Sequence, residues 1–248
     1  MCGRYALRDD VDQLIREFVA AGGRPDEWRP EGWQPTYSIA PTTWAPIVRE
    51  RVVDDERVRE LTLAQWDWER KPSMPRGGPI INATIEKLDG SFWGAAFSSS
   101  RCIVPMTGYF EWTGEKGDKT PHFLHADGTL AAAGLTWSFG AADGTRRRAF
   151  VVVTREARDA SGEIHDRMPA FVDDELLEAW LSPVPLTIAG DAAASRRRRA
   201  ELLEQLDVSS AAIASTIRTH VVDRRVNNSR SVDRYDSTIL DPVPAERD

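Results

Sequence analysis

The feature that most constrains the fold is a succession of strand-like runs in the second half of the chain. The first spans 101–112, and the most apolar spans 148–156. Between them, 121–137 contains Asp127-Gly128, a dipeptide typical of a tight hairpin turn. Strands that follow one another through turns, without intervening helices, pair antiparallel. The sequence therefore predicts an α+β fold with a β-rich, mostly antiparallel core and peripheral helices.

The rest of the chain supplies those helices, further strands and loops. Residues 9–20 carry apolar side chains on one helical face, and Asp9 or Asp10 can cap this helix. The other predicted elements are helices at 173–181 and 195–206, strands at 46–53, 57–66 and 217–226, and loops at 21–46 and 67–80. Because no internal repeat or linker divides the sequence, we expect one domain over 1–236 and a loosely held tail over 237–248.

The composition limits the kinds of partner. The 248 residues carry a formal net charge of −7. That charge argues against a surface broadly adapted to nonspecific DNA binding, although it is compatible with a local basic groove. Two cysteines do not indicate a disulfide framework, and the scattered histidines and cysteines lack metal-ligand spacing. We therefore expect no metal and no cofactor.

The chain also lacks the sequence features of membrane attachment or export. No apolar run reaches the length of a membrane span. Asp9, Asp10 and Asp12 stand where a signal peptide would be apolar. We expect a cytoplasmic monomer that does not bind membranes.

Cys2 is the residue with the most specific chemistry. Removal of Met1, which a small second residue permits, leaves an amine and a thiol on adjacent carbons. A terminal amine has a pKa of about 8, so a useful fraction is unprotonated near neutral pH. The amine can condense with an aldehyde to an imine, and the thiol can close on the imine carbon to give a thiazolidine. The alternative reading is a cysteine buried for packing alone.

Three further residues are candidates for proton transfer or positioning. Glu111 lies between aromatic residues in GYFEW (108–112), surroundings that raise a carboxyl pKa; a solvent-facing glutamate is the alternative. His165 lies in a polar, proline-containing loop and is a candidate general acid. Asn82 follows an apolar run and can hold a substrate oxygen or an amine, or cap a turn.

Candidate contacts to nucleic acid occur beside these residues. Arg4 and Arg167 are candidate phosphate contacts. Trp68 offers a surface for base stacking, although most of the nine tryptophans are expected in the core. The run Arg196–Arg199 is expected to be a solvated helix face.

Several blocks along the chain resemble one known family. They are MCGRY (1–5), YSIAPTT (37–43), INATIE (81–86), FWGAAFSSSRCIVPMTGYFEW (92–112), HDRMPAF (165–171) and RVNN (225–228). In this order they resemble the SOS-response-associated peptidase (SRAP) family, which crosslinks abasic DNA. Any single block is weak, but the set is highly specific and covers nearly the whole chain.

The resemblance implies a single SRAP-like domain with a basic groove for single-stranded DNA. It implies that Cys2 forms the crosslink, that Glu111 assists imine formation, and that His165 assists sugar-ring opening and reversal. Asn82 matches the asparagine that positions Cys2 and the open sugar. Arg4 and Arg167 match phosphate-contacting arginines, and Pro41 lies in a groove-lining loop.

The sequence also departs from the family pattern around the predicted groove. Thr84 stands where the family usually has an arginine, and Lys87 replaces a threonine. The loop after Trp66 lacks the usual Gly and Pro-Trp elements. We therefore expect the DNA contacts at Trp68 and Thr84 to differ in strength from the family's, while the four chemical residues are retained.

Three functions are compatible with these residues. The leading hypothesis is a sensor of abasic sites in single-stranded DNA that captures the sugar aldehyde through Cys2, protects the strand, and reverses the link or acts in a lyase-like way. Such a protein would associate with damaged DNA in the nucleoid. The second is a cysteine peptidase with Cys2 as nucleophile and His165 as its base. The third is a noncovalent single-strand binder, which the acidic net charge makes less attractive.

Overall fold

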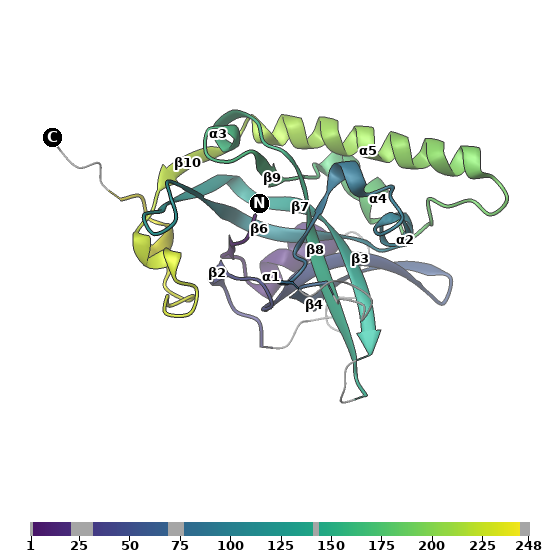
Figure 1. Ribbon diagram of the computed structural model, residues 1–248. Helices are drawn as coiled ribbons and strands as arrows, with labels where there is room; N and C mark the ends of the chain where they lie inside the picture. Colours follow the sequence, from purple (N-terminus) through teal and green to yellow (C-terminus); the bar gives the residue numbers. More distant parts are fainter. Residues whose placement is uncertain (1, 21–31, 69–76, 141–143, 244–248) are drawn as a thin grey trace.

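The computed structural model describes residues 2–20, 32–68, 77–140 and 144–243, and its centre is one strongly curved sheet (Figure 1). Neighbouring strands pair in the order β10-β7-β8-β4-β3-β6-β1-β2, and β6 pairs with β7 as well, so the middle of the sheet closes into a barrel. The strands are β1 (Tyr5–Leu7), β2 (Thr36–Ile39), β3 (Trp44–Val53), β4 (Glu56–Trp66), β5 (Asn82–Thr84), β6 (Arg101–Thr113), β7 (Thr120–Gly140), β8 (Arg146–Glu156), β9 (Arg167–Pro169) and β10 (Arg218–Val221).

The predicted single α+β domain with a mostly antiparallel core is confirmed. Only the β4–β8 and β5–β8 pairs among the described strands are parallel. The four strand-like runs at 46–53, 57–66, 101–112 and 148–156 correspond to β3, β4, β6 and β8. These runs are rich in β-branched and aromatic residues and are buried on at least one face, which is why local pattern identifies them.

The predicted hairpin at Asp127-Gly128 is wrong. Strand β7 continues through this dipeptide and pairs with β6 on both sides of it. Met106 faces Leu130 and Gly108 faces His125, so a single residue of β6 between these pairs corresponds to four residues of β7. The turn residues therefore form an outward excursion in one long strand. Gly128 takes a positive φ of 78° there, which glycine tolerates at low cost.

Two other segments also differ from the predictions. The expected loop at 21–46 contains β2, because Thr36–Ile39 adds to the edge of the sheet beside β1; residues 21–31 lie outside the described part. The expected strand at 217–226 ends at Val221 and is followed by the 3-10 helix η3 (Arg224–Asn227).

Residues 237–243 of the expected tail have contacts with the rest of the protein. The 3-10 helix η4 (Ser237–Leu240) buries Ile239 completely. The His220 Nε2 atom lies 2.8 Å from the Leu240 carbonyl oxygen, and the Val243 N–H donates to the Val221 carbonyl at 2.9 Å. These contacts hold the segment against β10, and residues 244–248 lie outside the described part.

The helices lie around the barrel, and α4 and the long α5 run next to each other across one side of it (Figure 1). Asp10 caps the first helix, since its side chain accepts from the Gln13 N–H at 2.8 Å. None of the described helices is long and apolar enough to cross a membrane. The helical elements not yet given are α1 (Val11–Leu14), η1 (Ile15–Val19), η2 (Ile85–Lys87), α2 (Gly94–Ser99), α3 (Asp159–Gly162), α4 (Asp174–Leu181) and α5 (Ala192–Ala214).

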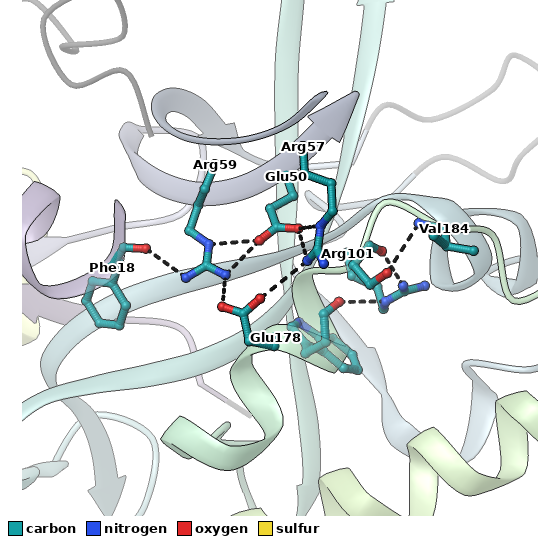
Figure 2. A network of polar contacts seen from close by, with 9 residues as sticks. Phe18, Glu50, Arg57, Arg59, Arg101, Glu178 and Val184 are labelled. Atoms are coloured by element: carbon teal, nitrogen blue, oxygen red, sulfur yellow. Dashed lines mark hydrogen bonds and ion pairs between the residues drawn. The ribbon is translucent and has the colours of Figure 1, made fainter. Parts of the chain in front are cut away.

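Buried arginines attach α4 and α2 to the barrel (Figure 2). Arg59 on β4 binds Glu50 on β3 and Glu178 on α4. Arg101 at the start of β6 donates four hydrogen bonds of 2.6–2.7 Å to backbone carbonyls near the ends of α2 and α4. The accepting residues are Phe97, Ser98, Trp180 and Ser182. Burial lowers the pKa of Arg101 to about 10, and the guanidinium stays charged at neutral pH.

Replacing Arg101 by methionine is expected to lower the free energy of unfolding by about 3 to 5 kcal/mol, because carbonyls inside the protein lose a charged donor. Arg57→Met is the matched control: this side chain is 49% exposed and pairs with Glu50, so its loss should cost less than about 1 kcal/mol. Urea unfolding of both variants measures the difference. Equal losses for the two would show that Arg101 does not hold the helix ends.

Candidate active site

Cys2 lies inside the protein, immediately before β1, and its backbone is held by Asn82. The side chain of Cys2 is fully buried. The Asn82 Nδ2 atom donates a hydrogen bond to the Cys2 carbonyl oxygen at 2.8 Å. Asn82 is the first residue of β5, which runs parallel to β8 with Asn82 opposite Val152. The chain end is therefore fixed to a side chain 80 residues away.

The position of Asn82 is set by hydrogen bonds to the residue before it. The Ile81 carbonyl accepts from the Val152 N–H at 3.0 Å and from the Trp66 indole N–H at 2.9 Å. The Asn82 Oδ1 atom is buried and accepts no hydrogen bond from any residue of the described ranges. One end of the amide thus holds Cys2, and the other remains available as an acceptor.

Glu111 on β6 supplies a buried carboxyl beside Cys2. The residue is 4% exposed. Burial raises the pKa of Glu111, and the charge of His165 opposes this shift. Burial and the charge of Glu111 both raise the pKa of the Cys2 thiol. These electrostatic effects require the three side chains to lie near one another, and they keep the thiol protonated.

The loop that carries His165 is attached to the same strand as Glu111. Tyr109 lies two residues before Glu111 and so on the same face of β6. Its hydroxyl lies 2.7 Å from the Ser161 Oγ atom in α3. The Ser161 carbonyl in turn accepts the His165 N–H at 3.0 Å. A chain of hydrogen bonds therefore fixes the position of His165 relative to β6.

The imidazole of His165 has two neighbours at one ring nitrogen. Nδ1 lies 2.9 Å from the Arg167 backbone nitrogen and 2.7 Å from the Asp166 Oδ1 atom. An unprotonated Nδ1 accepts from the Arg167 N–H, and a protonated Nδ1 donates to Asp166. The loop of His165 therefore supplies both a donor and an acceptor to this ring nitrogen.

The structure brings together the four residues predicted to be chemical: Cys2, Asn82, Glu111 and His165. Sequence reasoning missed Tyr109 and Ser161, which join the strand of Glu111 to the loop of His165. The available signal was the spacing in GYFEW, since a residue two before Glu111 shares its face of the strand. The sequence contains no signal for Ser161.

Arg4, a predicted phosphate contact, points into the protein. The residue is 7% exposed. Its Nη1 atom donates to the Ser38 Oγ at 3.0 Å and to the Val226 carbonyl at 3.1 Å, and its guanidinium lies 5.8 Å from the centre of the Trp112 ring. In this arrangement Arg4 joins β1, β2 and η3 from within, so it does not offer an exposed cation.

Arg167, the second predicted phosphate contact, is paired with a carboxylate. Its two terminal nitrogens bind the two oxygens of Glu86 at 2.8 and 3.1 Å, and Nη2 also donates to the Thr154 carbonyl at 2.8 Å. The hydrogen bond from Arg167 lowers the pKa of Glu86. Glu86 lies on the surface in η2, two residues after the half-buried Thr84, so Thr84 and Arg167 belong to one patch.

Trp68 is 9% exposed, so little of its ring is available for stacking. Its ring contacts Trp93 at 4.9 Å and Trp137 at 5.8 Å between centroids. Trp137, which sequence reasoning did not select, is 44% exposed and is the more accessible member of this cluster. Pro41 is partly exposed after β2. Residues 69–76 of the predicted loop lie outside the described part.

No cluster of histidine, cysteine and acidic side chains suited to a metal ion occurs in the described ranges.

The chain matches a known family in sequence and in fold. The family model described as SOS response associated peptidase (SRAP) matches residues 1–229. The chain belongs to the SRAP family. The abasic site processing protein YedK of Escherichia coli (strain K12) is 30% identical over 186 residues, which cover 73% of this chain and 79% of that protein. The abasic site processing protein YoqW of Bacillus subtilis (strain 168) is 28% identical over 192 residues, which cover 74% and 81%.

Solved structures show the same fold. A phage-related protein from Bordetella bronchiseptica has a TM-score of 0.65 at 26% identity, and the match covers 89% of this chain and 94% of that one. A protein from Bacteroides thetaiotaomicron has a TM-score of 0.66 at 19% identity, and the match covers 98% of this chain and 100% of that one. The SRAP resemblance of the sequence is thus confirmed for family and fold.

Glu111→Gln is expected to make the protein more stable relative to the parent as pH rises. A raised pKa in the folded state means that ionising Glu111 opposes folding. This destabilisation is absent below the ordinary glutamate pKa of about 4 and grows as pH rises through the raised value. Urea unfolding of both proteins at several values between about pH 4 and pH 8 measures it. A variant that loses stability relative to the parent over this range would contradict a buried, raised carboxyl.

Proposed function

We propose that this protein captures the aldehyde of an abasic site in single-stranded DNA as a thiazolidine on Cys2, after removal of Met1. The observation that carries the proposal is the 2.8 Å hydrogen bond from Asn82 to the Cys2 carbonyl, which fixes the prospective terminal residue beside Glu111. The names of relatives such as YedK and YoqW, each an abasic site processing protein, support the choice of substrate.

The raised thiol pKa determines the order of the steps. A neutral thiol is a weak nucleophile, so the amine reacts first. It adds to the C1′ aldehyde of the ring-opened sugar and the adduct loses water, which gives an imine. The Cys2 sulfur then adds to the imine carbon, and its proton passes to the nitrogen. The five-membered ring resists hydrolysis better than an open imine.

The neighbouring groups supply the proton transfers. Glu111, with a raised pKa, can take a proton from the attacking amine and return one to the departing water. His165 can protonate the ring oxygen of the closed sugar as it opens, with its imidazole held in place by the contacts at Nδ1. The free Oδ1 of Asn82 can accept from the amine or from the sugar.

The predicted DNA contacts need one rearrangement. Arg167 can bind a phosphate by exchanging Glu86 for it, because both partners present two oxygens to the same guanidinium edge. In this proposal Thr84 and Pro41 line the groove, and Trp68 supports it through its contact with the exposed Trp137. Arg4 acts by positioning β1, and therefore Cys2, rather than by direct contact with phosphate.

A cysteine peptidase is less compatible with this site. A peptidase nucleophile works as a thiolate and needs a lowered pKa. Here burial and Glu111 both raise the pKa of the Cys2 thiol. The same two features favour a mechanism that begins at the amine.

Tag-free protein is expected to form a heat-stable adduct with single-stranded DNA that carries one abasic site. Cys2→Ser keeps the terminal amine but lacks the thiol, so it should give an adduct only when borohydride reduces the imine. Denaturing gels with and without borohydride read the result, and intact-mass analysis confirms loss of Met1. Equal heat stability of the Cys2→Ser adduct without borohydride would exclude the thiazolidine.

His165→Gln is expected to slow release of the DNA more than it slows capture, because it removes the group proposed to act on the sugar oxygen in both directions. The purified adduct is incubated with excess unlabelled abasic DNA, and loss of the label is followed over time. Release at the parent rate would withdraw the reversal role of His165.

A further inference from the structure

A cavity lies next to β2, outside the candidate site. It is bounded by β2, the start of β3 and residues 234–235, which precede η4, and its volume is about 360 Å³. Pockets that bind small organic groups have volumes of about 300–1,000 Å³. The cavity is therefore large enough for one planar heterocycle. Its most informative lining residues are Trp33, Gln34, Ser38, Trp44, Arg234 and Tyr235.

Two of these aromatic side chains are unusually exposed. Trp44 is 41% exposed and Tyr235 is 44% exposed, although both line the cavity. Large aromatic side chains usually bury most of their surface in the core. Both rings therefore keep exposed surface that a ligand can contact.

A cation accompanies the rings. The Arg234 guanidinium lies 4.8 Å from the centre of the Tyr235 ring, and its Nη2 atom donates to the Tyr235 hydroxyl at 2.6 Å. No carboxylate in the described part of the chain forms an ion pair with it, so its charge is available to an anionic partner. The backbone holds it in place, because the Tyr37 N–H donates to the Arg234 carbonyl at 2.7 Å.

The cavity is joined to the candidate site through a shared wall. Ser38 lines the cavity and accepts the hydrogen bond from Arg4, which is two residues from Cys2. Trp44, the first residue of β3, follows Pro41 by three residues and so lies directly after the loop predicted to line the groove. The hydrogen bond between Ser38 and Arg4 thus links the cavity wall to the segment that carries Cys2.

These features select among the classes of ligand. An apolar ligand would not need Arg234 or the polar Gln34 and Ser38, and a bare phosphate would not need two exposed rings. A nucleotide of single-stranded DNA combines a flat base with an anionic phosphate, and base stacking on aromatic side chains is the usual mode of single-strand recognition. We propose that the cavity between Trp44 and Tyr235 binds one unpaired base of the strand, close to the abasic site, with Arg234 near its phosphate.

This inference rests on the proposed function, which identifies the strand as single-stranded abasic DNA. The base pocket extends that function with a subsite for specificity. Its role is to hold the flanking strand unpaired, so that capture favours abasic sites whose neighbours are single-stranded. Trp44 and Tyr235 are positioning residues in this scheme, because neither contacts the reacting atoms.

The test uses oligonucleotides with one reactive abasic site, in which each neighbouring nucleotide is replaced in turn by a stable spacer without a base. With the parent protein, the spacer at one position should lower capture about 5- to 100-fold at limiting protein, the range expected for loss of one stacked base. The rate at saturating protein should not change. Trp44→Ala should lower capture of the full oligonucleotide by a similar factor and lose discrimination at that position.

Trp44→Phe keeps an aromatic face and should restore the discrimination. Val208→Ala, an exposed apolar position on α5, is the surface control and should behave as the parent. Parent protein that ignores every spacer, or Trp44→Ala that still discriminates, would overturn the subsite.

A second measurement keeps the subsite separate from the covalent chemistry. Fluorescence anisotropy measures binding of single strands in which a stable spacer replaces the reactive site itself. Weaker binding by Trp44→Ala, with no heat-stable adduct from the parent, would retain the base pocket and reject covalent capture. A heat-stable adduct from the parent, with unchanged binding by Trp44→Ala, would retain covalent capture and reject the base pocket.

Discussion

The candidate site depends on strand β8, which pairs with the two short strands β5 and β9. Strand β8 pairs with β7 and β4 over its first part, and with β5 and β9 over its second part. Asn82 is thereby placed opposite Val152, and Arg167 opposite Glu156, four residues further along the same strand. Strand β8 is buried and hydrogen-bonded on both edges, so its position is well fixed. It therefore also fixes strand β5, which begins at Asn82, and strand β9, which follows the loop of His165.

Burial shifts the pKa values of Glu111 and Cys2, and for Glu111 it also costs stability. A carboxyl such as Glu111 is rarely buried unless its charge is compensated, and its raised pKa reflects that cost. The same burial keeps the Cys2 thiol protonated. In the proposed mechanism this suppresses thiolate reactions and leaves the amine as the first nucleophile. The stability lost to Glu111 is offset elsewhere, for example by Arg101, whose guanidinium fixes the ends of two helices.

Two predicted phosphate contacts, Arg4 and Arg167, already have partners within the protein. Arg4 is hydrogen-bonded inside the protein through its Nη1 atom and Arg167 is paired with Glu86, so neither offers an exposed, unpaired cation beside the site. In the proposed function, aromatic contact is then the main way to hold a strand that lacks a base at one position. The cavity with Trp44 and Tyr235 extends this aromatic surface away from Trp68 and Trp137.

The sequence by itself determined the local properties of this protein. The strands β3, β4, β6 and β8 and the SRAP family could be predicted, because apolar runs and short motifs are local signals. The same motifs selected Cys2, Asn82, Glu111 and His165 as candidates for the chemistry. It could not determine the partners of Arg4 and Arg167: Arg4 binds Val226, 222 positions away, and Arg167 binds Glu86, 81 positions away. The same limit explains the hairpin predicted at Asp127-Gly128, since a turn signal does not show whether the strand resumes against the same neighbour. Only the tertiary structure decided which side chains are buried, which charges are neutralised and which rings stay exposed, because these depend on contacts between segments that the chain brings together only when the barrel closes.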